Sequence, residues 1–329
     1  MGARNILIGV LVFLGCGPVS PDTLSSHKEL GSFSSWSTPV NLGPVVNTAA
    51  SDHRPAVPRT QGRSSPLSLY FGSNRPGSVG IVDGTDLYVS KRATEHDPWG
   101  PAHKVEALSS PGDDNAPTFS PDGHWMYFGS NRPGGCGGFD IWAAHRDDVE
   151  DDFGWEPPVN LGCHINSAAD EDGPTYFEAE DGTATLYFTS FQRPGGLGDW
   201  DIYASTALAH DHVSFGPAVL VRELSSDRRD TRPAIRHDGL EIFLVSNRVG
   251  SVPDAEGRPS LDIWVSTRAS TADAWSPPVN LGPPINTPAL DGGPCLSFDG
   301  EELFFDSNRA GGSGSRDLYS ARRSRMREN

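Results

Sequence analysis

One sequence motif occurs five times along the chain, and this repetition constrains the fold more than any other feature. The octet Trp-Ser-Thr-Pro-Val-Asn-Leu-Gly at residues 36–43 recurs almost unchanged from Trp155 and Trp275, with weaker copies at Trp99 and Phe215. About 60 residues separate successive copies, which is room for four short strands and their loops. A period of this length is typical of solenoids and propellers, so we expect one repeated supersecondary unit.

Each repeat carries the same series of strand and turn signals. In the second copy, Pro117 opens a short strand, residues 120–123 (Ser-Pro-Asp-Gly) form a turn, and an apolar strand follows at residues 126–128. A Ser-Asn-Arg element, a glycine-rich loop and a third strand beginning at Asp140 complete the unit. Gly 37 and Pro 28 together make about a fifth of the 329 residues, which excludes a helical bundle. Four short antiparallel strands per repeat form a propeller blade.

The two ends of the chain indicate how the ring closes. The repeats begin with the strand that elsewhere ends a unit, at residues 36–42, and stop after the third strand of the last unit. A solenoid would instead need polar caps at both ends. We therefore predict an all-β, five-bladed β-propeller of four-stranded antiparallel blades over residues 36–322, closed by its N-terminal strand and followed by a tail at 323–329. The expected blades are 55–107, 117–161, 174–221, 233–281, and 294–322 with 36–42.

The repeats resemble the PD40 family of WD40-like repeats, which also forms the propeller domain of TolB. The likeness rests on Ser-Pro-Asp-Gly at 120–123, on the Ser-Asn-Arg elements, and on strands such as Asp-Ile-Trp at 140–142 and Asp-Leu-Tyr at 317–319. It covers residues 36–322 and implies a β-propeller that is extracytoplasmic in many bacterial members and often binds proteins. The chain has no counterpart of TolB's separate N-terminal domain.

The N-terminal segment is predicted to direct export. An apolar run of about nine residues ends before Cys16, far short of the roughly 20 that span a membrane. The sequence before Cys16 resembles a bacterial lipobox, so we expect a signal peptide at 1–15, lipidation of Cys16 and a tether at 16–35. The expected location is periplasmic or outer-membrane-anchored, and the alternative is plain secretion.

The charge of the chain excludes some partners. Lys+Arg 26 against Asp+Glu 43 gives a net charge of −17, which disfavours nucleic acid and anionic membrane surfaces. We expect a monomer that binds an envelope protein or a carbohydrate and meets the membrane only through its lipid anchor.

Strand order places the acidic loops before each proline and the glycine-rich loops on one face, called here the upper face. An arginine after Ser-Asn and an aspartate opening the third strand recur there in every blade, and five copies of one pair indicate scaffolding rather than a ligand site. We predict that each arginine binds the aspartate of its own blade; the alternative is an arginine ring for anionic ligands. The pairs are Arg75 and Asp86, Arg132 and Asp140, Arg193 and Asp201, Arg248 and Asp262, and Arg309 and Asp317.

Acidic residues gather near the expected mouth of the central channel. The predicted binding face consists of Asp52, Asp113, Asp170, Asp230 and Trp200. Carboxylates of this kind suit calcium, which takes six to eight oxygen ligands, although no EF-hand spacing is present and no metal site is assigned.

An enzyme hypothesis rests on the same loops. Five-bladed propellers include glycosidases, and a pair of carboxylates is the minimal requirement for glycoside hydrolysis. The candidates are Asp114, Asp172 and Asp291, with His53, His164 and Arg232 nearby. Because fold analogy alone is a weak warrant, our main interpretation is a non-catalytic binding or scaffolding module of the cell envelope, and the alternative is a carbohydrate-active enzyme.

Cys136 and Cys163 belong to loops of the same face at one blade boundary. We predict a disulfide between them, since exported proteins retain disulfides. A zinc site built from these cysteines and His164 is the alternative, but it lacks the Cys-x-x-Cys spacing of structural zinc sites.

Overall fold

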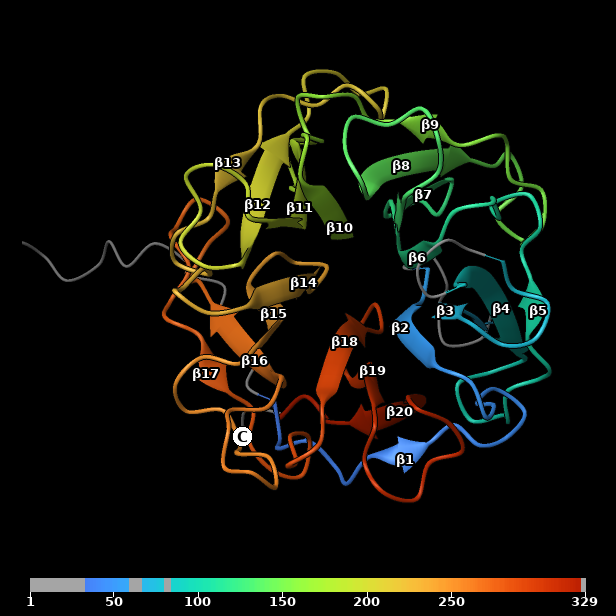
Figure 1. Ribbon diagram of the computed structural model, residues 1–329, viewed down its shortest axis with the longest axis vertical. Coiled ribbons are helices and arrows are strands. Elements are labelled where there is room, and N and C mark those ends of the chain that lie inside the picture. Colours follow the sequence, from blue (N-terminus) through green and yellow to red (C-terminus); the bar gives the residue numbers. More distant parts are fainter. Residues whose placement is uncertain (1–32, 59–66, 80–83, 327–329) are drawn as a thin grey trace, which may run out of the picture.

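The computed structural model describes residues 33–58, 67–79 and 84–326. Twenty strands form five sheets arranged in a ring around a central axis (Figure 1). Blade 1 contains β2 (Asp52–Ala56), β3 (Leu67–Ser73), β4 (Asp86–Arg92) and β5 (His103–Lys104); blade 2 contains β6 (Asp114–Phe119), β7 (Trp125–Ser130), β8 (Asp140–His145) and β9 (Val159–Asn160); blade 3 contains β10 (Asp170–Glu178), β11 (Ala184–Phe191), β12 (Trp200–Thr206) and β13 (Val219–Leu220); blade 4 contains β14 (Asp230–Ile235), β15 (Glu241–Ser246), β16 (Asp262–Thr267) and β17 (Val279–Asn280); and blade 5 contains β18 (Asp291–Leu296), β19 (Glu302–Ser307), β20 (Asp317–Arg322) and β1 (Val40–Asn41).

The predicted all-β, five-bladed propeller is confirmed, and the described residues contain no helix. All pairings within the blades are antiparallel, and β1 pairs with β20 to complete blade 5. The closure is reinforced by side chains, because Asn41 Nδ2 donates to Asp317 Oδ2 at 2.8 Å. The buried Asn47 also exchanges two hydrogen bonds with the backbone of Leu318. The first and last strands of the ring are therefore held together although they lie at opposite ends of the chain.

The inner strand of every blade has the same backbone irregularity next to its proline. The ladder register shifts there in all five blades, because proline has no N–H to donate. The residue before the proline has a positive φ in each case: Arg54 (54°), Ala116 (52°), Gly173 (58°), Arg232 (52°) and Gly293 (56°). These five residues line one small cavity, and the inner strands that carry them surround the centre of the ring in Figure 1.

The core lies between neighbouring blades. Tyr70 of blade 1 packs edge-on against Phe119 of blade 2, with ring centroids 5.1 Å apart, and Trp155 lies against both rings. Such aromatic pairs contribute about 0.5–1.5 kcal/mol beyond the area that they bury. These contacts fix each blade relative to the next, and so they also fix the side chains that meet at the axis.

The domain extends beyond the expected limits of 36–322. Phe33 forms a β-bridge with Arg325, and Arg323, placed in the tail by the sequence, is only 8% exposed and donates to Glu241 Oε2 at 2.5 Å. The expected signal peptide (1–15), Cys16 and most of the tether lie outside the described residues. Within the described part of the chain, no helix is long and apolar enough to cross a membrane.

Candidate functional site

The repeated arginines do not bind the predicted aspartates. Arg132 Nη2 donates to Asp114 Oδ1 at 2.6 Å and to the carbonyl of Leu108, so its partner is the first residue of the inner strand and not Asp140. The same pairing joins Arg75 to Asp52, Arg193 to Glu171, Arg248 to Asp230 and Arg309 to Asp291. The structural interpretation of these arginines fits the geometry, but the predicted partners are wrong.

The third-strand aspartates instead hold the glycine-rich loops. Asp317 Oδ2 accepts hydrogen bonds from the amide of Ser313 at 2.6 Å and from Asn41. The same arrangement is built around the other four members of the set, with a loop amide donating to each of Asp86, Asp140, Asp201 and Asp262. The acids of the inner strands and the aspartates of the third strands therefore both recur once per blade. The first set binds arginines, and the second set binds amides of the glycine-rich loops.

Most of the predicted site acids are therefore bound to groups of the protein itself and are not available to a ligand. The side chains of Asp52, Asp114, Asp230 and Asp291 have no exposed surface and are saturated by an arginine, a serine hydroxyl and loop amides. Asp113 is 1% exposed and caps the amide of Thr85, and Asp170 accepts from the amide of Phe139. Because these carboxylates already serve protein donors, they do not form the calcium site or the catalytic set considered from the sequence.

A different group of charged side chains meets on the axis. We call it the channel mouth, and it consists of Arg54, Asp172, Trp200, Arg229, Arg232, Asp306 and Arg316. Of the predicted residues it contains Asp172, Trp200 and Arg232. A cavity of about 130 Å³ opens there. Beneath it, the five inner-strand prolines narrow the channel to cavities of about 30 and 40 Å³, so the mouth is a closed cup.

Arg54 connects the two carboxylates of the mouth. Its guanidinium donates to Asp172 Oδ2 at 2.6 Å and also to Asn115, while its backbone amide donates to Asp306 Oδ1 at 3.0 Å. Arg316 and Arg232 approach Asp306 from the other side, at 3.4 and 4.0 Å. One residue of blade 1 therefore positions an acid of blade 3 and an acid of blade 5.

The excess of arginines controls ionisation in the mouth. Burial opposes the charge of Asp306, but Arg316 and Arg232 outweigh it and lower the pKa of this carboxyl group, which therefore stays ionised. Burial, together with Arg54 and Arg316, lowers the pKa of Arg232 well below its ordinary value. His53, beside this cluster, has its pKa lowered to about 3 by burial and by Arg54, so it is neutral near pH 7.

Asp172 keeps one carboxylate oxygen without a partner. Its Oδ1 is buried and accepts no hydrogen bond from any described residue. The oxygen lies directly over Gly129, where a Cβ would come within 2.3 Å of it, so only glycine leaves room for this carboxylate. An unsatisfied carboxylate oxygen at the edge of a cup can accept a hydrogen bond from a ligand hydroxyl.

An aromatic wall completes the cup. Trp200 is half-buried, packs against Phe191 with ring centroids 5.1 Å apart, and lies 5.4 Å from the guanidinium carbon of Arg229. Trp200 and Arg316 occupy the same position in their blades, immediately before the third-strand aspartate. The residue at this position therefore differs from blade to blade, unlike the repeated pairs of arginine and inner-strand acid.

The residues that sequence reasoning missed stand where one repeat departs from the others. Asp306 occupies the position that the strand registers assign to Gly72, Gly129, Thr189 and Val245. Arg54 occupies the left-handed position that is glycine in blades 3 and 5, where a side chain costs on the order of 1 kcal/mol. Arg229 and Arg316 were also missed. A comparison of the five copies for their differences would have found all four.

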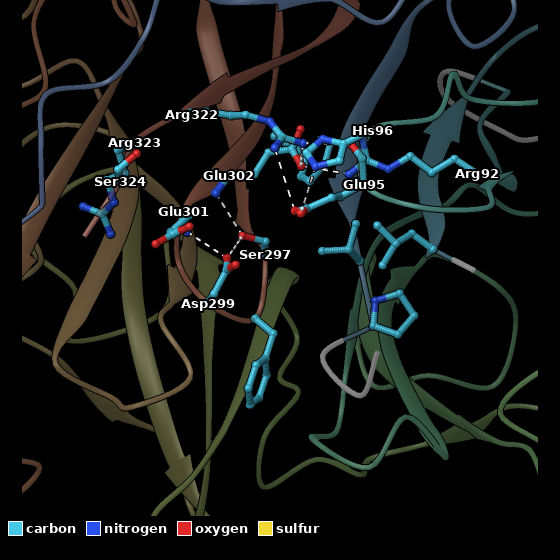
Figure 2. Close-up of a pocket in the computed structure, with 15 residues that line it drawn as sticks. Arg92, Glu95, His96, Ser297, Asp299, Glu301, Glu302, Arg322, Arg323 and Ser324 are labelled. Atoms are coloured by element: carbon cyan, nitrogen blue, oxygen red, sulfur yellow. Dashed lines mark hydrogen bonds and ion pairs between the residues drawn. The ribbon is translucent and has the colours of Figure 1, made fainter. Parts of the chain in front are cut away.

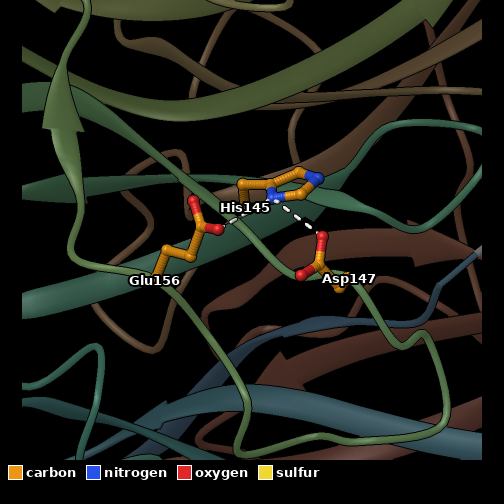
Figure 3. Close-up of side chains that lie close together, drawn as sticks. All are labelled: His145, Asp147 and Glu156. Carbon is orange, nitrogen blue, oxygen red and sulfur yellow. Dashed lines mark ion pairs between the residues drawn. The ribbon is translucent and has the colours of Figure 1, made fainter.

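A separate cluster could hold a metal ion. His145, Asp147 and Glu156 bring one nitrogen and two carboxylate oxygens within 4.8 Å of one another (Figure 3). The cluster lies at the outer end of blade 2, and Asp147 is 94% exposed. It is distinct from the channel mouth.

A larger cavity than that of the channel mouth lies on the opposite face. It has a volume of about 410 Å³ and lies between blades 1 and 5 (Figure 2). Pro58 and Leu67 both line it, and residues 59–66 between them are outside the described part of the chain. Its charges are paired, since Glu302 Oε2 accepts from Arg92 at 2.8 Å and from Arg322 at 3.1 Å. Arg92 Nε in its wall is buried without a hydrogen-bond partner, while Arg92 Nη2 is bound to Glu302.

Cys136 and Cys163 form the predicted disulfide, with their Cα atoms 5.7 Å apart. It joins the glycine-rich loop of blade 2 to the loop that leads into blade 3. The structure therefore pairs these cysteines with each other and leaves no zinc site of the kind considered as the alternative.

Comparison with known proteins shows a shared fold. No family model and no curated protein matches the sequence. Among solved structures, a thermostable family-43 glycoside hydrolase has a TM-score of 0.60 at 15% identity, with 88% of this chain and 94% of that chain covered. An arabinanase from Bacillus subtilis has a TM-score of 0.56 at 14% identity, with coverages of 85% and 96%. A β-xylosidase/α-arabinofuranosidase from a compost microbial metagenome, in complex with xylotriose and in a calcium-free form, has a TM-score of 0.56 at 15% identity, with coverages of 89% and 95%.

These comparisons correct three expectations from the sequence. The resemblance to the PD40 family is wrong, because no family model supports it and the similar solved structures are glycoside hydrolases. The same structures overturn the interpretation of the chain as an envelope binding or scaffolding module, and the expectation that it is not an enzyme. At these identities the likeness establishes the fold, and the activity of this chain has to be argued from its own site.

Proposed function

We propose that the protein is a glycoside hydrolase that acts at the channel mouth. The observation that carries the proposal is that Asp172 lines the closed cup, while the fully buried Asp306, from another blade, is ion-paired with Arg316 of the same cup. The fold is one that the similar solved glycoside hydrolases share. Two carboxylates of distinct environment are what the hydrolysis of a glycosidic bond requires.

The two acids have different parts in this proposal. Asp172 has the oxygen without a protein partner, so we assign it to contact with the sugar and to proton transfer at the glycosidic bond. Asp306 has no exposed surface and stays ionised, so we assign it to electrostatic stabilisation of the positive charge that develops on the sugar. Trp200 offers an aromatic face for one sugar ring, and the small cup takes one sugar residue at a time.

The proposal is tested by hydrolysis of neutral and uronate-bearing xylo- and arabino-oligosaccharides. Asp172→Asn should lower kcat by at least about 100-fold, the ordinary contribution of a positioned acid or base, measured at a temperature where the variant is folded. Asp170→Asn is the matched control, because Asp170 lies two residues away and binds only the amide of Phe139. Absence of hydrolysis by the wild-type chain, or full activity of Asp172→Asn, would reject the proposal.

Calcium remains a separate proposal for this chain. The imidazole of His145 makes the cluster with Asp147 and Glu156 less suited to calcium, which prefers oxygen ligands, than to a transition metal. Melting the protein with added calcium, with zinc and with a chelator distinguishes these cases.

We also propose that the protein is exported from the cytoplasm. The disulfide between Cys136 and Cys163 supports it, since such bonds persist in oxidising compartments. Fractionation of the producing cells, followed by mass analysis of the N-terminus, decides between lipidation of Cys16 and plain secretion.

A further inference from the structure

The channel mouth concentrates positive charge in a strongly acidic protein. Four guanidinium groups, from Arg54, Arg229, Arg232 and Arg316, face two carboxylates there, in a chain whose net charge is −17. The exposed carboxylate of Asp199, outside the cup, also acts on Arg229, and His53 is neutral. The cup therefore has more positive than negative charge.

Several donors of these arginines are not used by the protein. Arg232 Nη1 and Arg54 Nε are buried and donate no hydrogen bond to any described residue; the contact of Arg232 Nη1 with Asp306 Oδ1, at 4.0 Å, is an ion pair without a hydrogen bond. Arg229 has no carboxylate within 4.0 Å in the described part of the chain and only lies over Trp200. Buried donors are almost always satisfied, so orphaned guanidinium nitrogens around one cup indicate a missing acceptor.

The backbone is also strained at two of these arginines. Arg54 and Arg232 both have the left-handed conformation that Gly173 and Gly293 adopt at the same position of other blades. A side chain is strained there, and strained residues gather where function requires them. Both arginines in this strained conformation carry an orphaned nitrogen; among the described residues, Arg92 and Arg146 also have one, outside the channel mouth.

The arginine excess conflicts with glycoside hydrolysis of a neutral sugar. The transition state of that reaction carries positive charge on the sugar ring, and nearby guanidinium groups repel it. A negative group on the substrate itself would satisfy the arginines and remove this repulsion. Guanidinium is planar and matches a planar carboxylate with two parallel hydrogen bonds.

We infer that the channel mouth recognises a carboxylate-bearing saccharide, a uronate, through Arg232, Arg229 and Arg54, with the sugar ring against Trp200. This inference rests on the proposed hydrolase function and adds its substrate class. The carboxylate binds the arginines, while a ring hydroxyl or the glycosidic oxygen lies at Asp172 Oδ1.

Binding of glucuronate and of glucose to the full chain, measured by isothermal titration, tests the inference, because the two sugars differ only in the carboxylate. Arg232→Gly removes one guanidinium at a position where two other blades already have glycine. Ala116→Gly is the matched control, since it makes the backbone change at the same position of blade 2 without altering charge. We expect glucuronate to bind wild type and Ala116→Gly alike, and to bind Arg232→Gly at least tenfold more weakly. Glucose should bind wild type at least tenfold more weakly than glucuronate.

The inference is overturned if glucose binds as well as glucuronate, if glucuronate does not bind, or if Arg232→Gly binds it normally. It is also overturned if sulfate at equal concentration displaces glucuronate as well as added glucuronate does, because the sugar ring would then contribute nothing. Hydrolysis separates the two proposals. If xylotriose and a xylobiose that bears glucuronic acid both stay intact while glucuronate binds as expected, the uronate site stands and the hydrolase proposal falls. If xylotriose is cleaved as fast as the uronate-bearing sugar, the hydrolase stands and the uronate inference falls.

Discussion

The guanidinium of Arg54 donates a hydrogen bond to Asp172 Oδ2 at 2.6 Å, although 118 positions separate the two residues in the chain. The contact crosses the axis from blade 1 to blade 3, and the backbone amide of Arg54 reaches Asp306 of blade 5 at the same time. With Arg229 and Arg232 of blade 4, four blades therefore contribute to one charged cup. The cup depends on the ring being closed, because Arg54, Asp172 and Asp306 each come from a different blade.

The disulfide between Cys136 and Cys163 should stabilise the folded protein. Cys136 and Cys163 are 27 positions apart, and closing a loop of this length in the unfolded chain corresponds to roughly 3.5 kcal/mol. The double variant Cys136→Ala/Cys163→Ala should lose about that free energy of unfolding in urea, and its melting temperature should fall by roughly 5–10 °C. A reductant should lower the melting temperature of the wild-type protein equally and leave the variant unchanged. A reductant-sensitive variant would contradict this explanation.

The repeated arginine pairs should matter more for stability than exposed ion pairs. Arg309→Met leaves the fully buried Asp291 without its 2.6 Å partner and should cost about 3 kcal/mol in urea unfolding. Arg258→Met is the control, since Arg258 pairs with Asp254 but its side chain is 71% exposed, and the loss should stay below about 0.5 kcal/mol. Equal losses in the two variants would show that the buried pairs are not a structural requirement.

The fold was predictable because the chain repeats itself, and the same repetition misdirected the search for the site. Five copies of one pattern determine strand number, order and closure. They do not determine which acid an arginine binds, because Asp114 and Asp140 both recur with the same period, and only the register of the inner strand brings Asp114 to Arg132.

The channel mouth was only partly predictable. Asp172 was found as an acid of the upper-face loops, and Trp200 because it departs from the aromatic positions that repeat in the blades. Asp306 was missed because it stands in a strand whose neighbours in other blades are small or apolar, and nothing local marks it as part of a site. Its role follows from convergence of blades 1, 4 and 5 on the axis, which brings Arg54, Arg232 and Arg316 to it. That is a tertiary relationship, which only the comparison of repeats could have suggested.

His53 should make the protein sensitive to mild acid. Its pKa is lowered from 6.5 to about 3 in the folded state, so below pH 6.5 the unfolded chain binds a proton that the folded chain does not. Stability contributed by the neutral ring is present above pH 6.5 and is lost as the pH falls toward 3. Between pH 7.5 and pH 5 this loss amounts to about 2 kcal/mol.

The measurement compares wild type with His53→Gln in urea at both pH values. Groups other than His53 titrate alike in the two proteins, so their contributions cancel in the difference. We expect the stability of the variant relative to wild type to improve by about 2 kcal/mol on going from pH 7.5 to pH 5. A constant difference would mean that His53 is protonated in the folded protein.

Asp306 should be coupled to the arginines around it. Asp306→Asn keeps the shape of the side chain but removes the negative charge that offsets the repulsion among Arg54, Arg232 and Arg316. The variant should therefore lose about 3 kcal/mol of unfolding free energy. Arg316→Gln in the same chain removes one of the repelling cations, so the double variant should be less destabilised than the sum of the single variants by at least about 1 kcal/mol. Urea unfolding of the four proteins gives this coupling energy directly. Additive losses would show that Arg316 and Asp306 do not interact, and the account of Asp306 as a counter-charge to these arginines would fail. A matched cycle with Arg316→Gln and Asp254→Asn should give no coupling, because Asp254 pairs with Arg258 in an exposed loop of blade 4.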